Sequence, residues 1–258
     1  MATTKLFPEE RYRKILQELE SSGRISVEDL SKAFGISQVT IRSDLQYLAS
    51  QKLLVRTHGG AIPAPRSDDE PPFDSRIDLH TPEKERIGRA AAALVNDGDV
   101  IGLDASTTAL AIATHLANKQ DLTIVTNGLA LANRMLMVPG ITLYLVGGFL
   151  RRDALSLIGH LGEDFLAGLN MQTFFVSAHG LSVQEGLTEM SAQEAAVKES
   201  FIRHARMTIA VLDSSKIGRV SLHSFAPLEN IQTIITNADA PLEQLDKMKT
   251  YGVEIILA

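Results

Sequence analysis

The chain has 258 residues, enough for two domains that each bury a core, and its lack of cysteine excludes disulfides and thiolate metal sites. No apolar run is long enough for a transmembrane helix and the first ten residues lack a signal-peptide core, so a cytoplasmic protein is expected. The net charge of −6 is uneven, because residues 1–66 hold 10 Lys and Arg against 7 Asp and Glu, as expected where only this part meets nucleic-acid phosphates.

Residues 1–62 have the pattern of a small helical domain that ends in a β-hairpin. Apolar periodicity predicts helices over about 8–21, 26–34 and 37–51. Ser26 and Ser37 are suitable N-caps for the second and third helices, and Gly35 suits the end of the second. A strand at 53–55, a polar tip at 56–60 and a return at 61–62 follow. Together these elements predict a winged helix-turn-helix domain.

The first turn of the third predicted helix carries side chains that suit DNA binding. A helix in this position reads base edges in the major groove with residues near its N-terminus. Arginine pairs with guanine through two hydrogen bonds, and hydroxyls contact phosphates or base edges. The predicted DNA-binding residues are Ser37, Gln38, Thr40, Arg42 and Ser43, with Arg56 and His58 at the wing tip. Alternatively, these are solvated positions on a small domain that mediates protein contacts.

Residues 63–82 are rich in proline and charge and show no hydrophobic period, so an interdomain linker is predicted there. From residue 83 to the end, short apolar runs alternate with helical patterns. Strands are expected near 100–103, 122–125, 141–146, 173–176, 208–212, 231–235 and 253–257. This alternation predicts an α/β domain over 83–258, with a mostly parallel, Rossmann-like sheet covered on both faces.

Polar or glycine-rich segments follow five of the predicted strands. In open α/β sheets, ligands bind at the carboxyl ends of the strands. Hydroxyls and backbone N–H groups at the start of the helix after the first strand suit a phosphate. The predicted effector-binding residues are Asp104, Ser106, Thr107, Thr108, Thr126, Asn127, Gly147, Gly148, Arg151 and Lys216. In the opposing interpretation, Ser106 is only a helix cap and Arg151 only a surface arginine.

Both parts of the chain resemble the DeoR family of bacterial transcription regulators. In the first part the resemblance lies in the stretches 36–45, with the run Thr40-Ile41-Arg42-Ser43-Asp44-Leu45, and 53–61, with the run Arg56-Thr57-His58-Gly59-Gly60-Ala61. In the second part it lies in 83–84, 104–108, 125–127, 146–148 and 213–216. Ser43 stands where the family usually has a second arginine, and Ala105 where glycine is common. Asp44 is expected to be a helix-surface partner of a neighbouring arginine rather than a base reader.

The resemblance implies a sensor domain similar to the ribose-phosphate isomerase fold, joined to the DNA-binding domain. It further implies a repressor of a sugar-metabolism operon that binds a double-stranded DNA operator as a homo-oligomer, either a dimer or a tetramer. The implied effector is a phosphorylated sugar held by the hydroxyl loop 106–108 and by Lys216. No cofactor, no metal and no membrane association are expected.

Two other functions are compatible with the residues of the body. One is a sugar-phosphate isomerase with an appended DNA-binding domain, since such chemistry needs a carboxylate base near the substrate. However, residues 177–180 contain no acid where the related enzymes carry one, and Glu185, Glu189 and Glu194 are expected at the solvated surface. The other is a body that multimerises without binding any ligand. A non-enzymatic regulator is the preferred interpretation.

Overall fold

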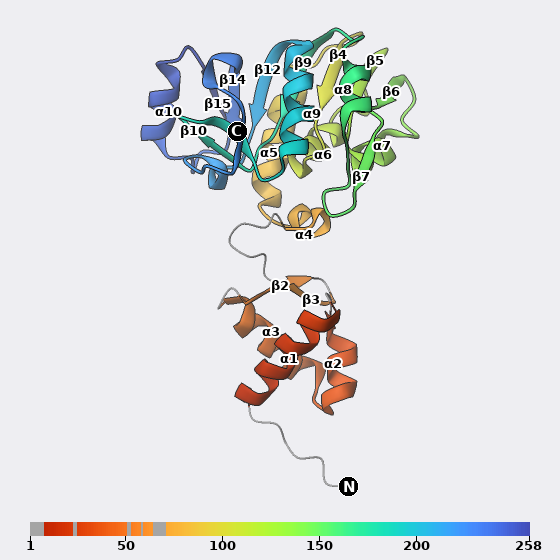
Figure 1. The fold of residues 1–258 in the computed structure, drawn as a ribbon, viewed down its shortest axis with the longest axis vertical. Helices are drawn as coiled ribbons and strands as arrows, with labels where there is room; N and C mark the ends of the chain where they lie inside the picture. Colours follow the sequence, from red (N-terminus) through yellow and green to blue (C-terminus); the bar gives the residue numbers. More distant parts are fainter. Residues whose placement is uncertain (1–7, 23–24, 51–52, 58, 64–70) are drawn as a thin grey trace. The chain divides into compact units, whose positions relative to one another are not determined.

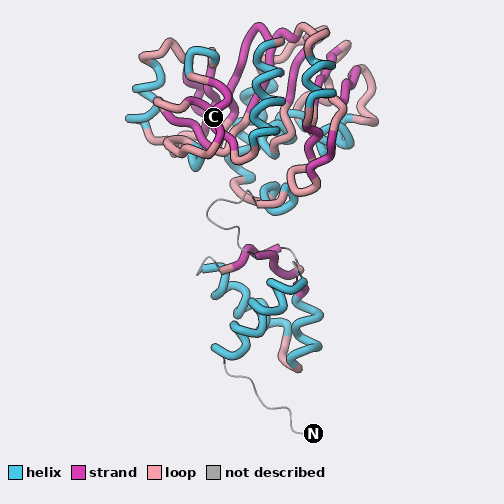
Figure 2. The backbone as a smooth tube through the Cα atoms, viewed as in Figure 1, coloured by secondary structure: helices cyan, strands magenta, loops and turns pink. Residues whose placement is uncertain are grey.

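The computed structural model describes residues 8–22, 25–50, 53–57, 59–63 and 71–258. These belong to two compact units, Met1–Pro71 and Pro72–Ala258 (Figure 1). The first unit is mainly helical, whereas helices and strands alternate in the second (Figure 2).

The first unit has the predicted three helices and hairpin wing. Its elements are α1 (Pro8–Ser22), β1 (Ile25–Ser26), α2 (Val27–Phe34), α3 (Gln38–Ser50), β2 (Leu54–Thr57) and β3 (Gly60–Pro63). The Ser26 hydroxyl caps α2 by accepting the Asp29 N–H at 3.0 Å, and Gly35 ends it in the left-handed region at φ 63°. The core joins all three helices through Ile15, Leu30, Ile41 and Leu45.

Strand β1 was not predicted, because two residues are too short to show a pattern. It pairs antiparallel with β3, so Ile25 lies opposite Ala61 and Ser26 opposite Gly60. A Cβ atom on Gly60 would lie 1.8 Å from the Ile25 carbonyl oxygen. The close approach of the two strands therefore requires glycine at this position.

Asp44 was expected on the helix surface, and that expectation is wrong. Its side chain is buried and binds the buried Arg11 through two hydrogen bonds of 2.8 Å each. The hydrogen bond to Asp44 raises the pKa of Arg11 despite the opposing effect of burial. Asp44 thus fixes α3 against α1 rather than facing solvent.

The second unit contains a seven-stranded sheet in which every neighbouring pair is parallel. The strand order is β15-β14-β12-β9-β4-β5-β6. The strands are β4 (Val100–Leu103), β5 (Leu122–Thr126), β6 (Ile141–Leu145), β9 (Met171–Val176), β12 (Ala205–Val211), β14 (Thr233–Thr236) and β15 (Glu254–Leu257). These are the seven strands that the sequence predicts.

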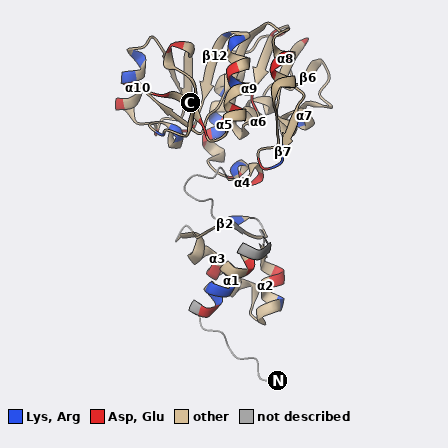
Figure 3. Cartoon of the chain, in the orientation of Figure 1, with Lys and Arg blue, Asp and Glu red and all other residues tan. Residues whose placement is uncertain are grey.

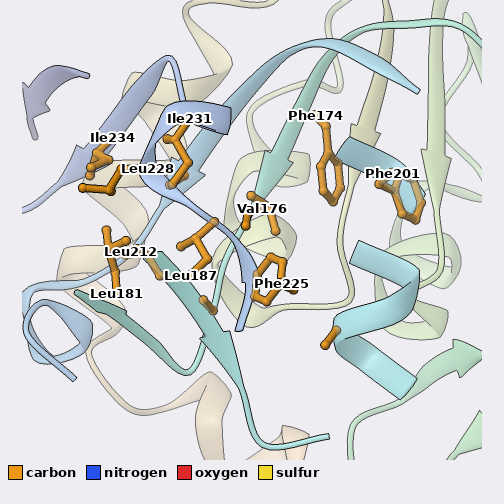
Figure 4. Close-up of a cluster of buried hydrophobic side chains, with 14 of the residues drawn as sticks. Phe174, Val176, Leu181, Leu187, Phe201, Leu212, Phe225, Leu228, Ile231 and Ile234 are labelled. Carbon is orange, nitrogen blue, oxygen red and sulfur yellow. The ribbon is translucent and has the colours of Figure 1, made fainter. Parts of the chain in front are cut away.

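Helices cover both faces of this sheet, as the near-continuous apolar strands require. One face packs against α5 (Thr81–Ala92), α6 (Thr107–Thr114) and α7 (Leu129–Met135). The other packs against α8 (His160–Leu166), α9 (Ala192–Arg203) and α10 (Leu242–Lys249). Along β9 the side chains alternate, with Phe174 and Val176 in one core and Phe175 in the other. Figure 4 shows the first core, where Phe174 stacks on Phe201 with ring centroids 4.6 Å apart.

Several short elements were missed because three- or four-residue strands carry little periodicity. A hairpin of β7 (Phe149–Arg151) and β8 (Ser156–Ile158) precedes α8. A small antiparallel sheet contains β10 (Gly180–Ser182), β11 (Gly186–Glu189) and β13 (His223–Ala226). Two short 3-10 helices, Ser214–Lys216 and Leu228–Asn230, complete the unit.

Part of the segment predicted as a linker is folded. Residues Phe73–Ile77 form the helix α4, and α5 begins at Thr81. The Phe73 side chain is buried, and its N–H donates to the Asp153 carbonyl at 2.7 Å. The second unit accordingly begins at Pro72, before the predicted start at residue 83. A buried aromatic residue outweighs the proline-rich composition of its surroundings.

Candidate functional site

The strand order of the sheet places a switch point between β4 and β9. From β4 the chain proceeds outward to β5 and β6, and it then returns to the other side of β4 to form β9. The connections that leave β4 and β9 therefore diverge, and the carboxyl ends of strands at such a point are where open α/β sheets usually bind ligands. Asp104 directly follows β4, and Ser177 directly follows β9.

The Asp104 carboxylate joins the two loops at this switch point. It is fully buried, and its two oxygens accept the N–H groups of Ser106 at 3.1 Å and Ser177 at 2.9 Å. The Lys198 ammonium lies 3.2 Å from the second oxygen. Asp104 therefore holds both loops in place through protein donors.

Lys198, on α9, is the central cation of a buried cluster that the sequence analysis did not identify. Its ammonium donates to the Ser177 carbonyl at 2.8 Å and to the Glu189 carboxylate at the end of β11. Burial disfavours the charged amine, but the carboxylates of Glu189, Asp104 and Glu194 outweigh burial and raise the pKa of Lys198. A buried cation thus joins the β4 loop, the β9 loop and β11.

Glu189 and Glu194 were expected at the solvated surface, and that expectation is wrong. Both side chains are buried. Glu194 binds Arg151 at 3.1 Å and accepts the Ser156 hydroxyl, so it connects α9 with the β7–β8 hairpin. Burial raises the pKa of Glu194, against the opposing effects of Lys198, Ser156 and Arg151.

The hydroxyl loop 106–108 forms the N-terminus of α6. The Ser106 hydroxyl caps this helix by accepting the Ala109 N–H at 3.0 Å, and the side chains of Thr107 and Thr108 are buried. The first N–H groups of a helix have no carbonyl partner within it, and the helix dipole favours an anion there. The loop is thus both a structural cap and a suitable place for a phosphate.

The loops after β5 and β6 lie beside this one. A Cβ atom on Gly128 would lie 2.9 Å from the Ala105 Cα, so the β4 and β5 loops are in contact. Thr126 and Asn127 are buried, and the Asn127 amide donates to the Leu157 carbonyl at 3.1 Å. The side-chain oxygen Oδ1 of Asn127 is buried and accepts no hydrogen bond from the part of the chain that the structure describes.

The Gly147-Gly148 pair follows β6 and is exposed. Gly148 has a φ of 145°, and a Cβ atom there would lie 2.3 Å from the Ile158 carbonyl oxygen. Glycine at 148 is therefore required for the close approach to β8. The predicted effector-binding residues from 104 to 148 thus lie at the carboxyl ends of β4, β5 and β6 or on the loops that follow, and Arg151 lies on β7 of the next hairpin.

Lys216 lies in the 3-10 helix after β12, at the same edge. Asp213 shapes this turn by accepting the Ser215 N–H at 3.0 Å. The sequence analysis gave no site role to Lys84, whose side chain is buried and whose pKa is affected by Asp213 and Lys216. Burial lowers the pKa of Lys84 to about 8; the negative charge of Asp213 opposes this shift, and the positive charge of Lys216 adds to it. The sequence signal was available, because Lys84, Ile87 and Ala91 share the buried stripe of α5.

The depressed pKa of Lys84 predicts a pH-dependent stability. The pKa is about 8 in the folded chain, against 10.5 for an ordinary lysine such as that of the unfolded chain. Between these values the unfolded chain binds a proton that the folded chain has lost, so the free energy of unfolding rises with pH. Denaturant titrations should show wild type gaining stability relative to Lys84→Met from pH 8 to pH 10, with no relative change from pH 6 to pH 7. A flat difference across the whole range would contradict the burial of the amine.

The N-terminal half of α3 presents an exposed polar surface. Gln38, Arg42 and Ser43 are exposed, and the Arg42 guanidinium donates to the side-chain Oε1 of Gln38 at 3.1 Å. The Ser37 hydroxyl accepts the Thr40 N–H at 3.2 Å and lies 2.9 Å from the Thr40 hydroxyl. The Ser37 side chain therefore caps α3, and the Thr40 hydroxyl is paired with it.

The remaining predicted DNA-binding residues belong to the wing. Arg56, on β2, donates to the Gln46 side chain of α3. His58 lies outside the described residues. Val39, which the sequence analysis did not select, is an exposed apolar residue on the first turn of α3. An apolar side chain at such a position suits contact with a thymine methyl group.

Two family models match the chain. The DeoR-like helix-turn-helix domain matches residues 11–65, and the DeoR C terminal sensor domain matches residues 79–238. The chain belongs to the DeoR family. The DeoR sensor-domain match includes the β4, β5, β6 and β12 loops and the buried cluster around Lys198.

Curated DeoR relatives align with nearly the full chain. The putative aga operon transcriptional repressor of Escherichia coli O157:H7 is 33% identical over 96% of this chain and 93% of its own length. The transcriptional repressor GlcR of Bacillus subtilis is 34% identical over 98% and 97%, respectively. The glycerol-3-phosphate regulon repressor of Escherichia coli K12 is 31% identical over 96% and 98%. This DeoR-family chain is therefore similar over its whole length to named transcriptional repressors.

Among solved structures, ribose 5-phosphate isomerase A of Methanocaldococcus jannaschii aligns with a TM-score of 0.39 and 17% identity, over 52% of this chain and 53% of that one. So partial an overlap says nothing about activity. No helix among the described residues of the DeoR-family chain is long and apolar enough to span a membrane.

Proposed function

We propose that this DeoR-family regulator represses a sugar-metabolism operon and that a phosphorylated sugar modulates its binding to operator DNA. The observation that carries the proposal is the placement of the hydroxyl loop 106–108 at the β4–β9 switch point, beside the loops that follow β5 and β6. The names of the relatives, which include an aga operon repressor and a glycerol-3-phosphate regulon repressor, support the regulatory role and the class of metabolite.

On the DNA side, the first turn of α3 enters the major groove. Arg42 and Gln38 read base edges, while Ser37, Thr40 and Ser43 contact phosphates or bases. Arg56 and His58 bind the flanking phosphates from the wing. Two or more copies bind repeated half-sites, so affinity falls steeply as the salt concentration rises.

On the sensor side, the effector phosphate lies at the N-terminus of α6. In the hydroxyl loop 106–108, the N–H groups of residues 107 and 108 donate to it, and the Lys216 ammonium supplies the opposite charge. Thr126 and Asn127 lie on the sugar side, where the Asn127 Oδ1, which accepts no hydrogen bond from the described residues, accepts one from a sugar hydroxyl. Asp104 supports this side by holding the adjoining loops. Gly147, Gly148 and Arg151 complete the rim. For the effector to act, it must bind two arrangements of the protein with different free energies.

A thermal-shift screen of sugar phosphates, with Lys216→Ala as the matched variant, tests the sensor role. A phosphorylated sugar at 100 times its Kd should stabilise wild type by about 2.7 kcal/mol, because the ligand binds only the folded chain. Lys216→Ala should lose most of this shift and still bind operator DNA with wild-type affinity. If Lys216→Ala responds like wild type, the phosphate has been placed wrongly.

We propose that the chain has no catalytic turnover. One observation favours the alternative function, a sugar-phosphate isomerase. Asp104, Glu189 and Glu194 are buried carboxylates near the switch point, and buried carboxylates serve as general bases in such enzymes. Here, however, Lys198 pairs with the first two and Arg151 with the third. An assay across pentose and hexose phosphates should detect no isomerisation, and measurable turnover would overturn this assignment.

A further inference from the structure

Exposed apolar side chains gather on one margin of the second unit. Large hydrophobic residues that are exposed are concentrated in residues 129–165, which include Phe149 at 74%, Leu161 at 76% and Met137 at 85% exposure. Single exposed residues of this kind are ordinary, but a contiguous group marks an interaction surface. The full group is Leu129, Leu136, Met137, Tyr144, Leu145, Phe149, Leu150, Leu161 and Phe165.

These residues flank the terminal strand of the sheet. Strand β6 pairs only with β5 among the described strands, so the N–H and C=O groups on its outer edge are available for another strand. Soluble proteins usually protect such an edge with charges or proline. Residues 140–150 contain no acidic or basic side chain, and β6 carries no charge in Figure 3. The opposite terminal strand, β15, carries Glu254.

Contacts between the elements show that part of this group is continuous. The Phe165 ring lies 6.1 Å from the Tyr144 ring, so α8 packs beside β6 on one face of the sheet. Leu161 and Phe165 are four residues apart and therefore lie on the same side of α8. A Cβ atom on Gly162 would lie 2.7 Å from the Gly147 carbonyl oxygen, which places the first turn of α8 near the segment that leads to Phe149. Helix α7, which ends before Leu136 and Met137, packs beside β6 on the other face.

We propose that β6, with the exposed apolar residues of α7, β7 and α8, forms a two-fold interface with a second copy of this chain. We call the nine exposed apolar residues between 129 and 165 the β6 surface. Antiparallel pairing of β6 with the same strand of a second copy satisfies both edges at once and makes the interface self-complementary. Because residues 140–150 carry no charge, the β6 edge itself presents no charge pattern that would select a different protein.

The area of the β6 surface agrees with a second copy as its partner. A fully exposed side chain of this size presents roughly 150–200 Å², so the exposed fractions of the nine residues correspond to on the order of 800 Å². Each partner contributes about 800 Å² to a standard-size interface, and the largest apolar patch of a monomer is about 300–600 Å². This inference rests on the proposed function, which requires a homo-oligomer, and it assigns the contact between copies to the β6 surface.

Sedimentation of the full chain, with single charged substitutions, tests this interface. Wild type should sediment as a dimer, or a tetramer, of the 28.0 kDa chain at micromolar concentration. Phe149→Glu and Leu161→Glu should each raise the dissociation constant at least tenfold, giving monomers from a dimer or dimers from a tetramer. Both residues are exposed, and circular dichroism identifies any variant that fails to fold. Leu242→Glu, on the exposed side of α10, is the matched control and should assemble like wild type.

Cross-linking gives a second measurement, because the chain has no cysteine of its own. A single Thr142→Cys substitution on β6 should give a covalent dimer with a short bismaleimide, and Glu243→Cys on α10 should not. A monomeric wild type, unchanged assembly of both glutamate variants, or equal cross-linking at residues 142 and 243 would each overturn the proposal. Operator binding and the thermal-shift response are measured on the same samples. If wild type shows neither operator binding nor a thermal shift, the proposed function is rejected. If wild type shows both and the two glutamate variants assemble like wild type, only the β6 interface is rejected.

Discussion

Replacement of Lys198 by methionine is expected to destabilise the second unit by about 3–5 kcal/mol, the cost of breaking a buried ion pair by removing one partner. The substitution keeps the length of the side chain but leaves Asp104 and Glu189 buried without their cation. It also removes the hydrogen bond to the Ser177 carbonyl. Urea unfolding followed by far-ultraviolet circular dichroism measures the change in the free energy of unfolding.

The matched control for this prediction is Lys247→Met. Lys247 is exposed and pairs with Glu243 at 2.7 Å, one helical turn away. Exposed pairs of this kind contribute about 0.3–0.5 kcal/mol, so the control should unfold almost like wild type. The double variant Glu189→Leu/Lys198→Met should recover part of the lost free energy of unfolding, because one of the two buried carboxylates without a cation has been removed. Equal stabilities of Lys198→Met and Lys247→Met would show that the cluster is not buried as described.

Arg42→Ala is expected to weaken operator binding strongly and to leave the response to effector unchanged. A bidentate arginine–base pair contributes about 1–3 kcal/mol of discrimination, which is about 5-fold to 150-fold in affinity. Arg42 is exposed on α3 and lies outside the core of the first unit, so the domain should remain folded. Gel-shift or fluorescence-anisotropy titrations at fixed salt, with wild type and variant on the same operator, measure the loss.

Two further variants separate base reading from charge. Arg203→Ala removes the same charge from an exposed position on α9, where Arg203 pairs with Glu199, and should bind operator like wild type. Arg42→Lys keeps the charge but cannot make the bidentate hydrogen bonds of a guanidinium. It should therefore retain non-specific affinity for DNA and lose its preference for the operator sequence. If the Arg42→Ala variant still prefers the operator over random DNA, Arg42 does not read the base sequence.

Much of the fold could be predicted from the sequence, because its main elements have strong local signals. The caps at Ser26 and Ser106 set helix starts through their own side chains, and the seven core strands are apolar runs between helical patterns. Parallel strands place their carboxyl ends at one edge, so the loops after β4, β5, β6 and β12 could be assigned to one region. Short strands such as β7 and β10 could not, since three residues show no period.

The charged cluster was missed because charge was taken to mean exposure. Glu194, Lys198 and Phe201 occupy positions i, i+4 and i+7 of α9, and all three are buried. The spacing alone placed the two charged residues on the same face as the phenylalanine. Their partners, however, come from strands and loops distant in the sequence, such as Asp104 and Ser156. Pairing of this kind depends on the tertiary fold, which composition does not reveal.

The order of strands in the sheet has a consequence for synthesis on the ribosome. The three-stranded sheet of the first unit is complete when β3 ends at Pro63. Strand β4, by contrast, gains its second neighbour only when β9 has been made, at Met171–Val176. Long-range parallel pairing is slow to form, and domains near the N-terminus fold first during translation. A nascent chain therefore passes through a stage in which a finished winged helix precedes a sheet whose middle strand still has an open side.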